Sequence, residues 1–223
     1  DKTFVQTTIL GAWDVTDGFN GLVVLPADPL SGNAIKAPVV LRYTPSANLG
    51  DIYLGELLLE RLEDNGINWF LSAAFSHTEP NDVTTPFGGL MSDPFETPES
   101  QDGWSVYAGI RFPVGQRDFI GFEYNHGSKY WFNFTQAADD LLGSKLATRG
   151  DVYDLYWVRE WSEGFGRARA KMMLGVQYYD FEYSGSGWNV GAPKKLDGSQ
   201  PPILGFPTYS DAWDVRLALS VKF

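Results

Sequence analysis

Cysteine is absent from the 223-residue chain, and long uninterrupted apolar runs are absent too. Without cysteine, disulfides, thiol nucleophiles and cysteine metal ligands are excluded. A helical membrane span needs about 18 or more consecutive apolar residues, and the runs here are far shorter, which excludes helical spans. Basic residues are in the minority, with 17 Lys and Arg against 28 Asp and Glu, and the net charge of -11 argues against nucleic acid as a partner.

Strict alternation of apolar and polar residues marks the C-terminal end of the chain. From Trp213 to Phe223 every second residue is apolar. The positions between them are Asp214, Arg216, Ala218, Ser220 and Lys222. A period of two is typical of a β-strand with one apolar face, and a tilted strand of about 9–11 residues crosses the hydrocarbon layer of a membrane. We therefore predict that this segment is one strand of an all-β, antiparallel, up-and-down transmembrane barrel.

The chain is 43% hydrophobic, yet its mean hydropathy of -0.21 is that of a water-soluble protein. A barrel is compatible with this composition, because half of the residues in each strand face a polar lumen. A soluble β-sandwich is the alternative.

Six further segments repeat the alternation of apolar and polar residues. The connections between them are alternately short turns and long polar loops. The six segments cover residues 52–62, 67–77, 104–112, 119–125, 152–161 and 167–179. Their interiors contain no proline, as a hydrogen-bonded ladder requires, and Asn65-Gly66 is a strong hairpin signal between the first two. The long loops, residues 78–103, 127–151 and 181–211, fall on one side and are expected to be extracellular.

The alternation is weaker upstream of Asp51, where residues 3–13, 21–25 and 38–44 are candidates for three more strands. The total is then about ten, an even number that leaves both chain ends on the periplasmic side of one barrel domain. Residues 135–146 have helical character and predict a short helix within a long loop. Because the chain starts with Asp1 rather than Met, it is either a processed mature protein or an internal fragment.

The segments GFEYNHGSKYW at residues 121–131 and SKLATRGDVY at residues 144–153 resemble a family of uncharacterised, porin-like outer-membrane proteins of delta- and epsilon-proteobacteria. The resemblance covers about Trp104 to Phe223. It implies location in the bacterial outer membrane, in contact with lipid and lipopolysaccharide, and it carries no catalytic motif. Members of that family look longer than this chain, which implies that the chain can be the C-terminal part of a larger barrel. The terminal strand ending at Phe223 resembles the signal that the barrel-assembly machinery reads, so this machinery is an expected partner.

Strand parity places a set of charged side chains on the polar face, where they would line a lumen. They are Glu56, Glu60, Arg111, Glu123, Asp154, Glu160, Arg169, Lys171, Asp214 and Arg216. As the lining of a pore, these fixed charges would set ion selectivity. In a narrow barrel they could instead neutralise one another in an interior salt-bridge network.

The leading hypothesis is accordingly a porin-like channel for small hydrophilic solutes or ions, without enzymatic activity. The second is a structural or scaffold barrel, plugged by its own side chains or by a partner chain, whose extracellular loops bind a partner. A homo-oligomer is also left open. The third is an outer-membrane hydrolase at the rim, since His77 and His126 end outward-running strands with Ser76, Asn125 and Ser128 close in sequence. Such an enzyme needs a nucleophile, a base and an orienting group in one hydrogen-bonded chain.

Large aromatic residues near the strand ends fall on the apolar face, where such rings meet the membrane interface. They are Trp69, Trp104, Trp157, Trp161, Trp213 and Phe223. A sugar-binding aromatic track would need its rings on the opposite face. The loop carboxylates, such as Asp82 and Glu96, lack the regular spacing of a calcium site, so neither a metal site nor a cofactor is predicted.

Overall fold

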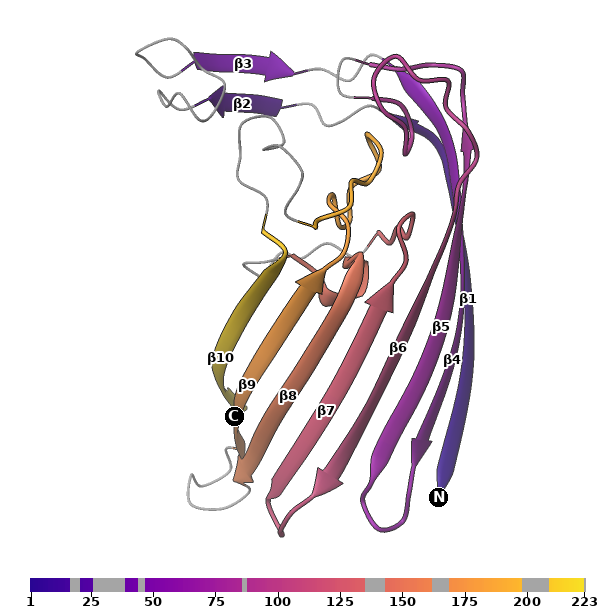
Figure 1. Ribbon diagram of the computed structural model, residues 1–223. Coiled ribbons are helices and arrows are strands. Elements are labelled where there is room, and N and C mark those ends of the chain that lie inside the picture. Colours follow the sequence, from indigo (N-terminus) through magenta and orange to yellow (C-terminus); the bar gives the residue numbers. More distant parts are fainter. Residues whose placement is uncertain are drawn as a thin grey trace.

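The computed structural model describes residues 1–16, 21–25, 39–43, 47–85, 88–134, 143–161, 169–197 and 209–222. Its main element is a curved sheet in which eight strands follow one another in the order β1-β4-β5-β6-β7-β8-β9-β10 (Figure 1). They are β1 (Lys2–Thr16), β4 (Asn48–Leu62), β5 (Asn68–Pro80), β6 (Asp102–Pro113), β7 (Asp118–Gly127), β8 (Gly150–Trp161), β9 (Arg169–Phe181) and β10 (Asp211–Lys222). All neighbours are antiparallel, which confirms the prediction of an all-β antiparallel fold. β1 and β10 are the edges of the sheet, and within the described ranges they do not pair with each other.

Short turns join the strands at one end of the sheet (Figure 1). In the turn between β4 and β5, the Glu63 amide donates to the Ile67 carbonyl at 2.8 Å and the Gly66 amide donates to the Glu63 carbonyl at 3.0 Å. Gly66 has a φ of +85°, in the left-handed region that glycine enters without a steric penalty. The predicted hairpin at Asn65-Gly66 is therefore confirmed. The turn between β8 and β9, residues 162–168, lies outside the described ranges.

Two short upstream strands are not part of this sheet. β2 (Gly21–Leu25) and β3 (Val39–Tyr43) pair with each other in a separate two-stranded sheet (Figure 1). The prediction that they extend the same barrel to about ten strands is not supported, because in the part of the chain that the structure describes these two strands lie outside the eight-stranded main sheet. Each short strand has 5 residues, about half of what a membrane-crossing strand needs, and the two pair with each other instead of with the main sheet.

The two faces of the main sheet differ in polarity. We call the face that carries Asp154 and Gln177 the inner face, and the opposite one the outer face. On the inner face, polar side chains are buried, among them Ser72, Ser105, Asn125, Asp154 and Gln177. On the outer face, large apolar side chains are exposed, among them Leu57, Leu71, Trp104, Phe122, Leu155, Leu174, Trp213, Val215, Leu217 and Leu219. A soluble β-sandwich, the alternative fold considered from the composition, buries its apolar faces between two sheets. Here the large apolar side chains are exposed and the polar side chains are buried, which is the opposite distribution.

The long connections lie at the end of the sheet opposite the short turns (Figure 1). Three of them comprise residues 81–101, 128–149 and 182–210, and the described parts of these three form what we call the loop cap. The cap packs around a small apolar core, made of Leu49, Ile52, Leu90, Met91, Phe132 and Val190. A β-bridge between Leu90 and Val190 joins the first connection to the third.

Helical structure is scarce in the described ranges. Of the predicted helix at residues 135–146, residues 135–142 fall outside those ranges, and the described remainder holds a short 3-10 helix, η2 (Lys145–Ala147). The hydroxyl oxygen of Ser144 caps it by accepting a hydrogen bond from the Leu146 amide. No helix among the described residues is long and apolar enough to span a membrane.

Candidate functional site

Asp154, in β8, is the centre of a polar network on the inner face. Its side chain is only 2% exposed. It accepts hydrogen bonds from Gln177 Nε2 at 2.8 Å, from Arg216 Nη2 at 2.8 Å and from Lys145 Nζ at 2.9 Å. Gln177 lies on β9 and Arg216 on β10, whereas Lys145 comes from the loop cap. This one carboxylate therefore ties three neighbouring strands to the cap.

Lys145 extends the network from Asp154 to β7. Its ammonium group also donates to Glu123, and Glu123 accepts a second hydrogen bond from the hydroxyl of Tyr107 on β6. Burial by itself lowers the pKa of Lys145, but the Glu123 and Asp154 carboxylates outweigh it, so the pKa is raised overall and the side chain stays charged. Two carboxylates thus face two cations, Lys145 and Arg216, and the network as a whole is neutral.

The backbone around Lys145 is held in place from two sides. Asn125 Nδ2, on β7, donates to the Lys145 carbonyl at 2.8 Å. The indole nitrogen of Trp131 donates to the next carbonyl, that of Leu146, at 2.7 Å. These bonds fix the η2 turn against the inner face, so the lysine reaches the carboxylates from a preset position.

A cavity of about 320 Å³ lies between the inner face and the 128–149 connection. The sheet side of its wall mixes polar residues, such as Glu56 and Ser72, with apolar ones, such as Leu54, and the loop side is largely apolar, with Trp131 and Leu146. The 128–149 connection therefore narrows the space in front of the sheet, and polar side chains of the strands form part of the lining of the cavity that remains.

Arg149, between η2 and β8, holds the loop cap together. Its side chain is almost fully buried, at 1% exposure. It donates to the carbonyls of Trp131 at 3.0 Å, Ser184 at 3.0 Å and Trp188 at 2.8 Å, and to the sulfur of Met91 at 3.3 Å. Burial lowers the pKa of Arg149 to about 10, which still leaves the guanidinium charged at neutral pH. All three long connections are thus linked through one side chain.

A family profile described as a protein of unknown function (DUF3373) matches residues 1–223. The chain belongs to this family. The resemblance inferred over residues 104–223 is confirmed as membership of an uncharacterised family, now over the whole chain, while the family description names neither a membrane nor transport. No curated protein and no solved structure matches the chain.

The charged residues predicted to line a lumen lie on the inner face, but their surroundings differ. Glu123, Asp154 and Arg216 belong to the neutral network. Glu56 and Glu60 accept hydrogen bonds from the neutral side chains of Ser72 at 2.7 Å and Asn68 at 3.2 Å. The remaining residues are Arg111, whose guanidinium lies 5.0 Å from the centre of the Phe119 ring, Asp214 opposite Gln177, Glu160 opposite Lys171, and Arg169 opposite Lys222.

Lys145 was missed by sequence reasoning. It lies in a long connection without strand periodicity, and its two acidic partners are 22 and 9 residues away along the chain. The helical character of residues 135–146 and the serine directly before Lys145 were local signals of an ordered turn, but neither points to the acidic partners.

The outer face carries a row of aromatic rings near the loop end of β7 to β10. Ring centroids are separated by 5.3 Å between Tyr124 and Tyr153, 6.4 Å between Tyr153 and Tyr178, and 4.6 Å between Tyr178 and Trp213. Of the other predicted interface aromatics, Trp104 is exposed, Trp69 donates to Glu63, Trp157 donates to Asp118, and Trp161 lies beneath the Arg159 guanidinium. Phe223 lies outside the described ranges.

The two histidines each pair with an aspartate of the next strand. His77 Nδ1 lies 2.7 Å from Asp102 Oδ1, and His126 Nδ1 lies 3.0 Å from Asp151 Oδ1. Ser76 and Asn125 are their neighbours along the strands and therefore point to the inner face. The alternation separates these groups from the histidines, so they do not form one hydrogen-bonded chain with them.

Proposed function

We propose that the chain forms an outer-membrane β-barrel that acts as a porin-like channel for small hydrophilic solutes or ions. The observation that carries the proposal is the polarity of the sheet, with apolar side chains exposed on the outer face and polar ones buried on the inner face. In water, an exposed apolar surface of this extent would drive association. In a bilayer the same surface contacts lipid, and the polar face lines an aqueous path.

The strand lengths support a membrane span. β8 and β10 each contain 12 residues. At about 3.3 Å per residue and a tilt of about 45°, such a strand spans about 28 Å, which is close to the hydrocarbon thickness of about 25–30 Å. The row from Tyr124 to Trp213 lies near the loop end of the strands, where amphipathic rings meet the membrane interface.

The edges of the sheet place a condition on this proposal. A strand edge exposed to lipid leaves backbone groups without partners, at a cost of several kcal/mol per group. β1 and β10 are such edges. In the membrane they must therefore pair with each other or with additional strands, and each additional strand would widen the lumen.

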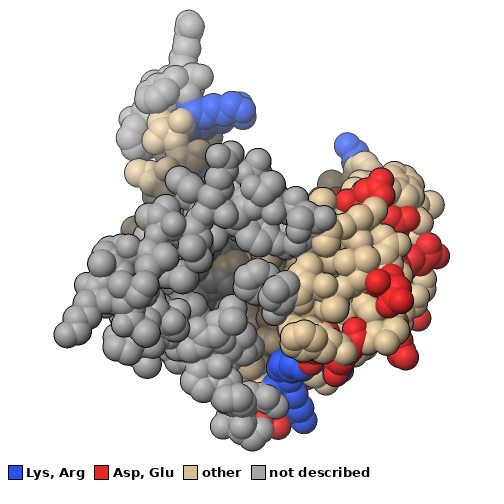
Figure 2. Space-filling view, turned by 90° about the horizontal axis from the view of Figure 1, so that it is seen from above, with Lys and Arg blue, Asp and Glu red and all other residues tan. Residues whose placement is uncertain are grey.

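Charge is unevenly distributed around the proposed lumen. Glu56 and Glu60 lie on β4, and Arg169 and Lys171 lie on β9, on the opposite side of the curved sheet (Figure 1). Seen from the loop end, acidic side chains gather over one part of the described surface (Figure 2). Exposed carboxylates of the first long connection are Asp82, Glu96 and Glu99. Because a negative entrance raises the local concentration of cations, we expect a cation preference.

Single-channel recording in a planar bilayer tests the channel. The intact polypeptide, folded in lipid and shown to be inserted by protection from protease, should produce discrete conductance steps in potassium chloride. An inserted protein that conducts no current would overturn the proposal.

A plugged scaffold barrel is the second candidate, and one observation favours it. The neutral network of Lys145, Glu123, Asp154 and Arg216 joins the loop cap to the inner face, as a plug would be held. If this candidate holds, the inserted wild-type protein is silent, and a variant that releases the cap conducts.

A further inference from the structure

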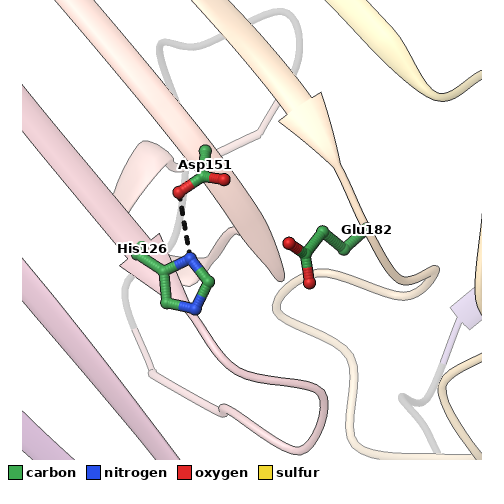
Figure 3. A group of neighbouring side chains, drawn as sticks. All are labelled: His126, Asp151 and Glu182. Carbon is green, nitrogen blue, oxygen red and sulfur yellow. Dashed lines mark hydrogen bonds and ion pairs between the residues drawn. The ribbon is translucent and has the colours of Figure 1, made fainter.

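Three potential metal ligands converge on the outer face at the loop end of the sheet. His126 lies near the end of β7, Asp151 near the start of β8, and Glu182 directly after β9. One ligand atom from each lies within 4.8 Å of the other two. Figure 3 shows the imidazole and the two carboxylates directed toward one another from these neighbouring elements. Sequence reasoning predicted no metal site, because the loop carboxylates lack regular spacing; the histidine and the aspartate of this cluster are 25 residues apart in the chain.

Strand pairing and backbone hydrogen bonds preset the three positions. His126 and Asp151 are directly opposed in the β7–β8 ladder, so their side chains leave the same face. The Glu182 amide donates to the Arg149 carbonyl at 3.0 Å, and the Glu182 carbonyl accepts from the Leu196 amide at 2.8 Å. Glu182 is therefore fixed through its backbone, while its exposed side chain is free to rotate.

The two less exposed ligands are also held by neighbouring aromatic side chains. The Tyr124 hydroxyl donates to Asp151 Oδ1 at 2.6 Å. The Trp104 ring lies 4.9 Å, centre to centre, from the imidazole of His126. A hydrogen bond to a ligating carboxylate and a packed imidazole ring are the outer contacts that orient ligands in metal sites.

We propose that His126, Asp151 and Glu182 bind a divalent transition-metal cation of the zinc type. Zinc bonds to nitrogen and oxygen are about 2.0–2.1 Å long, so two ligand atoms of a tetrahedral site are about 3.3 Å apart. The imidazole nitrogen and the aspartate oxygen already lie 3.0 Å apart, and the metal takes the place of the proton that they share. A rotation of the Glu182 side chain brings in the third ligand.

The donor set selects the class of metal. One imidazole and two carboxylates suit zinc and related cations, whereas calcium takes 6–8 oxygen ligands and magnesium retains most of its water. Three protein ligands leave one tetrahedral position open to water or an anionic oxygen. The site faces away from the lumen, so metal binding here is independent of the proposed channel.

The chain offers a matched control in its other histidine. His77 and Asp102 also pair across neighbouring strands on the outer face, at 2.7 Å. Among the described residues, however, only the set with His126 brings three ligands together. Replacing His77 removes a histidine–aspartate pair of the same geometry without touching the proposed site.

Zinc titration against a chromophoric chelator tests the proposal on the folded, full-length chain. The wild type should bind a single Zn²⁺, and His126→Ala and Glu182→Gln should each weaken binding by about 10–100-fold or more, while His77→Ala binds as the wild type does. Cobalt should give the visible absorption of a tetrahedral site in the wild type and in His77→Ala only. Equal zinc affinity of the wild type and His126→Ala, with both folded by circular dichroism, would overturn the proposal.

Tyr124→Phe provides a second measurement that does not remove a ligand. It deletes only the hydroxyl that orients Asp151, so zinc binding should weaken by about 10-fold while the cobalt spectrum keeps its tetrahedral form. If zinc affinity is unchanged in both Tyr124→Phe and Glu182→Gln, the three residues do not act as one site.

Discussion

Lys145 Nζ lies 2.9 Å from Asp154 Oδ2, and this contact joins a residue of the loop cap to a strand of the sheet. Both side chains are largely buried, with 20% exposure for Lys145 and 2% for Asp154. Since the cap lies in front of the inner face, the contact sets how far the 128–149 connection reaches across the proposed lumen.

Replacing Lys145 with methionine should release the cap. The change removes the cation that pairs with Glu123, and it leaves Asp154 with one cationic partner, Arg216. We expect this loss to lower the unfolding free energy by about 2–3 kcal/mol. Single-channel conductance should rise because the connection no longer lies against the sheet. Lys129→Met is the control, since Lys129 belongs to the same connection and donates to the Tyr130 hydroxyl instead of an acid. Equal conductance of the two variants would contradict this role.

Glu56 and Glu60 should contribute to ion selectivity. Their hydrogen-bond donors, Ser72 and Asn68, are neutral and do not cancel the charge. The double change Glu56→Gln and Glu60→Gln should therefore lower the cation-to-anion permeability ratio by about twofold, measured as the reversal potential in a salt gradient. Glu96→Gln, on the exposed surface of the cap, is the control and should shift the reversal potential less.

Two neighbouring positions of β10 test which face meets lipid. Leu217 is 72% exposed on the outer face, and Ala218 points to the inner face. Arginine in place of Leu217 should cost about 2–4 kcal/mol of unfolding free energy in lipid vesicles, as charges do near the bilayer midplane. Ala218→Arg should cost less, because its charge enters the polar interior. If Ala218→Arg costs more than Leu217→Arg, the inner face and not the outer face contacts lipid, which contradicts the proposal.

Arg149 should be far more sensitive to substitution than a surface arginine. Lysine cannot reproduce the fork of donors that reaches three carbonyls, and each buried group left unpaired costs about 1–3 kcal/mol. We expect Arg149→Lys to lower the free energy of unfolding by at least about 2 kcal/mol in urea titrations. Arg61→Lys is the matched change at an exposed ion pair, where a loss of about 1 kcal/mol or less is expected. Similar losses in the two variants would show that Arg149 does not organise the cap.

Gly150 should not tolerate a side chain. Its φ is +135°, and a Cβ atom there would lie 2.2 Å from the Asp180 carbonyl oxygen. Gly150→Ala should therefore fold poorly. In gel electrophoresis, its unheated sample should lack the shifted mobility that distinguishes the folded wild-type protein from the heated one. Gly55→Ala should migrate as the wild type does, because no atom lies within 4 Å of a Cβ at that position. Normal folding of Gly150→Ala would contradict the close approach of β8 and β9 at this point.

The strands and their apolar faces were predictable because the signal for each lies within one segment. In β10, the outward positions Trp213, Leu217 and Leu219 are visible as every second residue. The hairpin at Asn65-Gly66 was predictable for the same reason, since a turn type depends on adjacent residues. The pairing partners of the weaker segments were not predictable, because pairing depends on contacts between distant segments; β2 and β3 pair with each other and not with the main sheet.

The sequence by itself determined the all-β class, the polarity of each strand and the end of the sheet that carries the long connections, because all of these follow from local periodicity and spacing. Only the tertiary structure decided that Lys145 meets Asp154 and that Arg149 collects three carbonyls from two of the long connections. It also decided that Glu182 joins His126 and Asp151. Each of these contacts involves a residue of an aperiodic loop, so its partners depend on how the loops pack and not on any pattern within them.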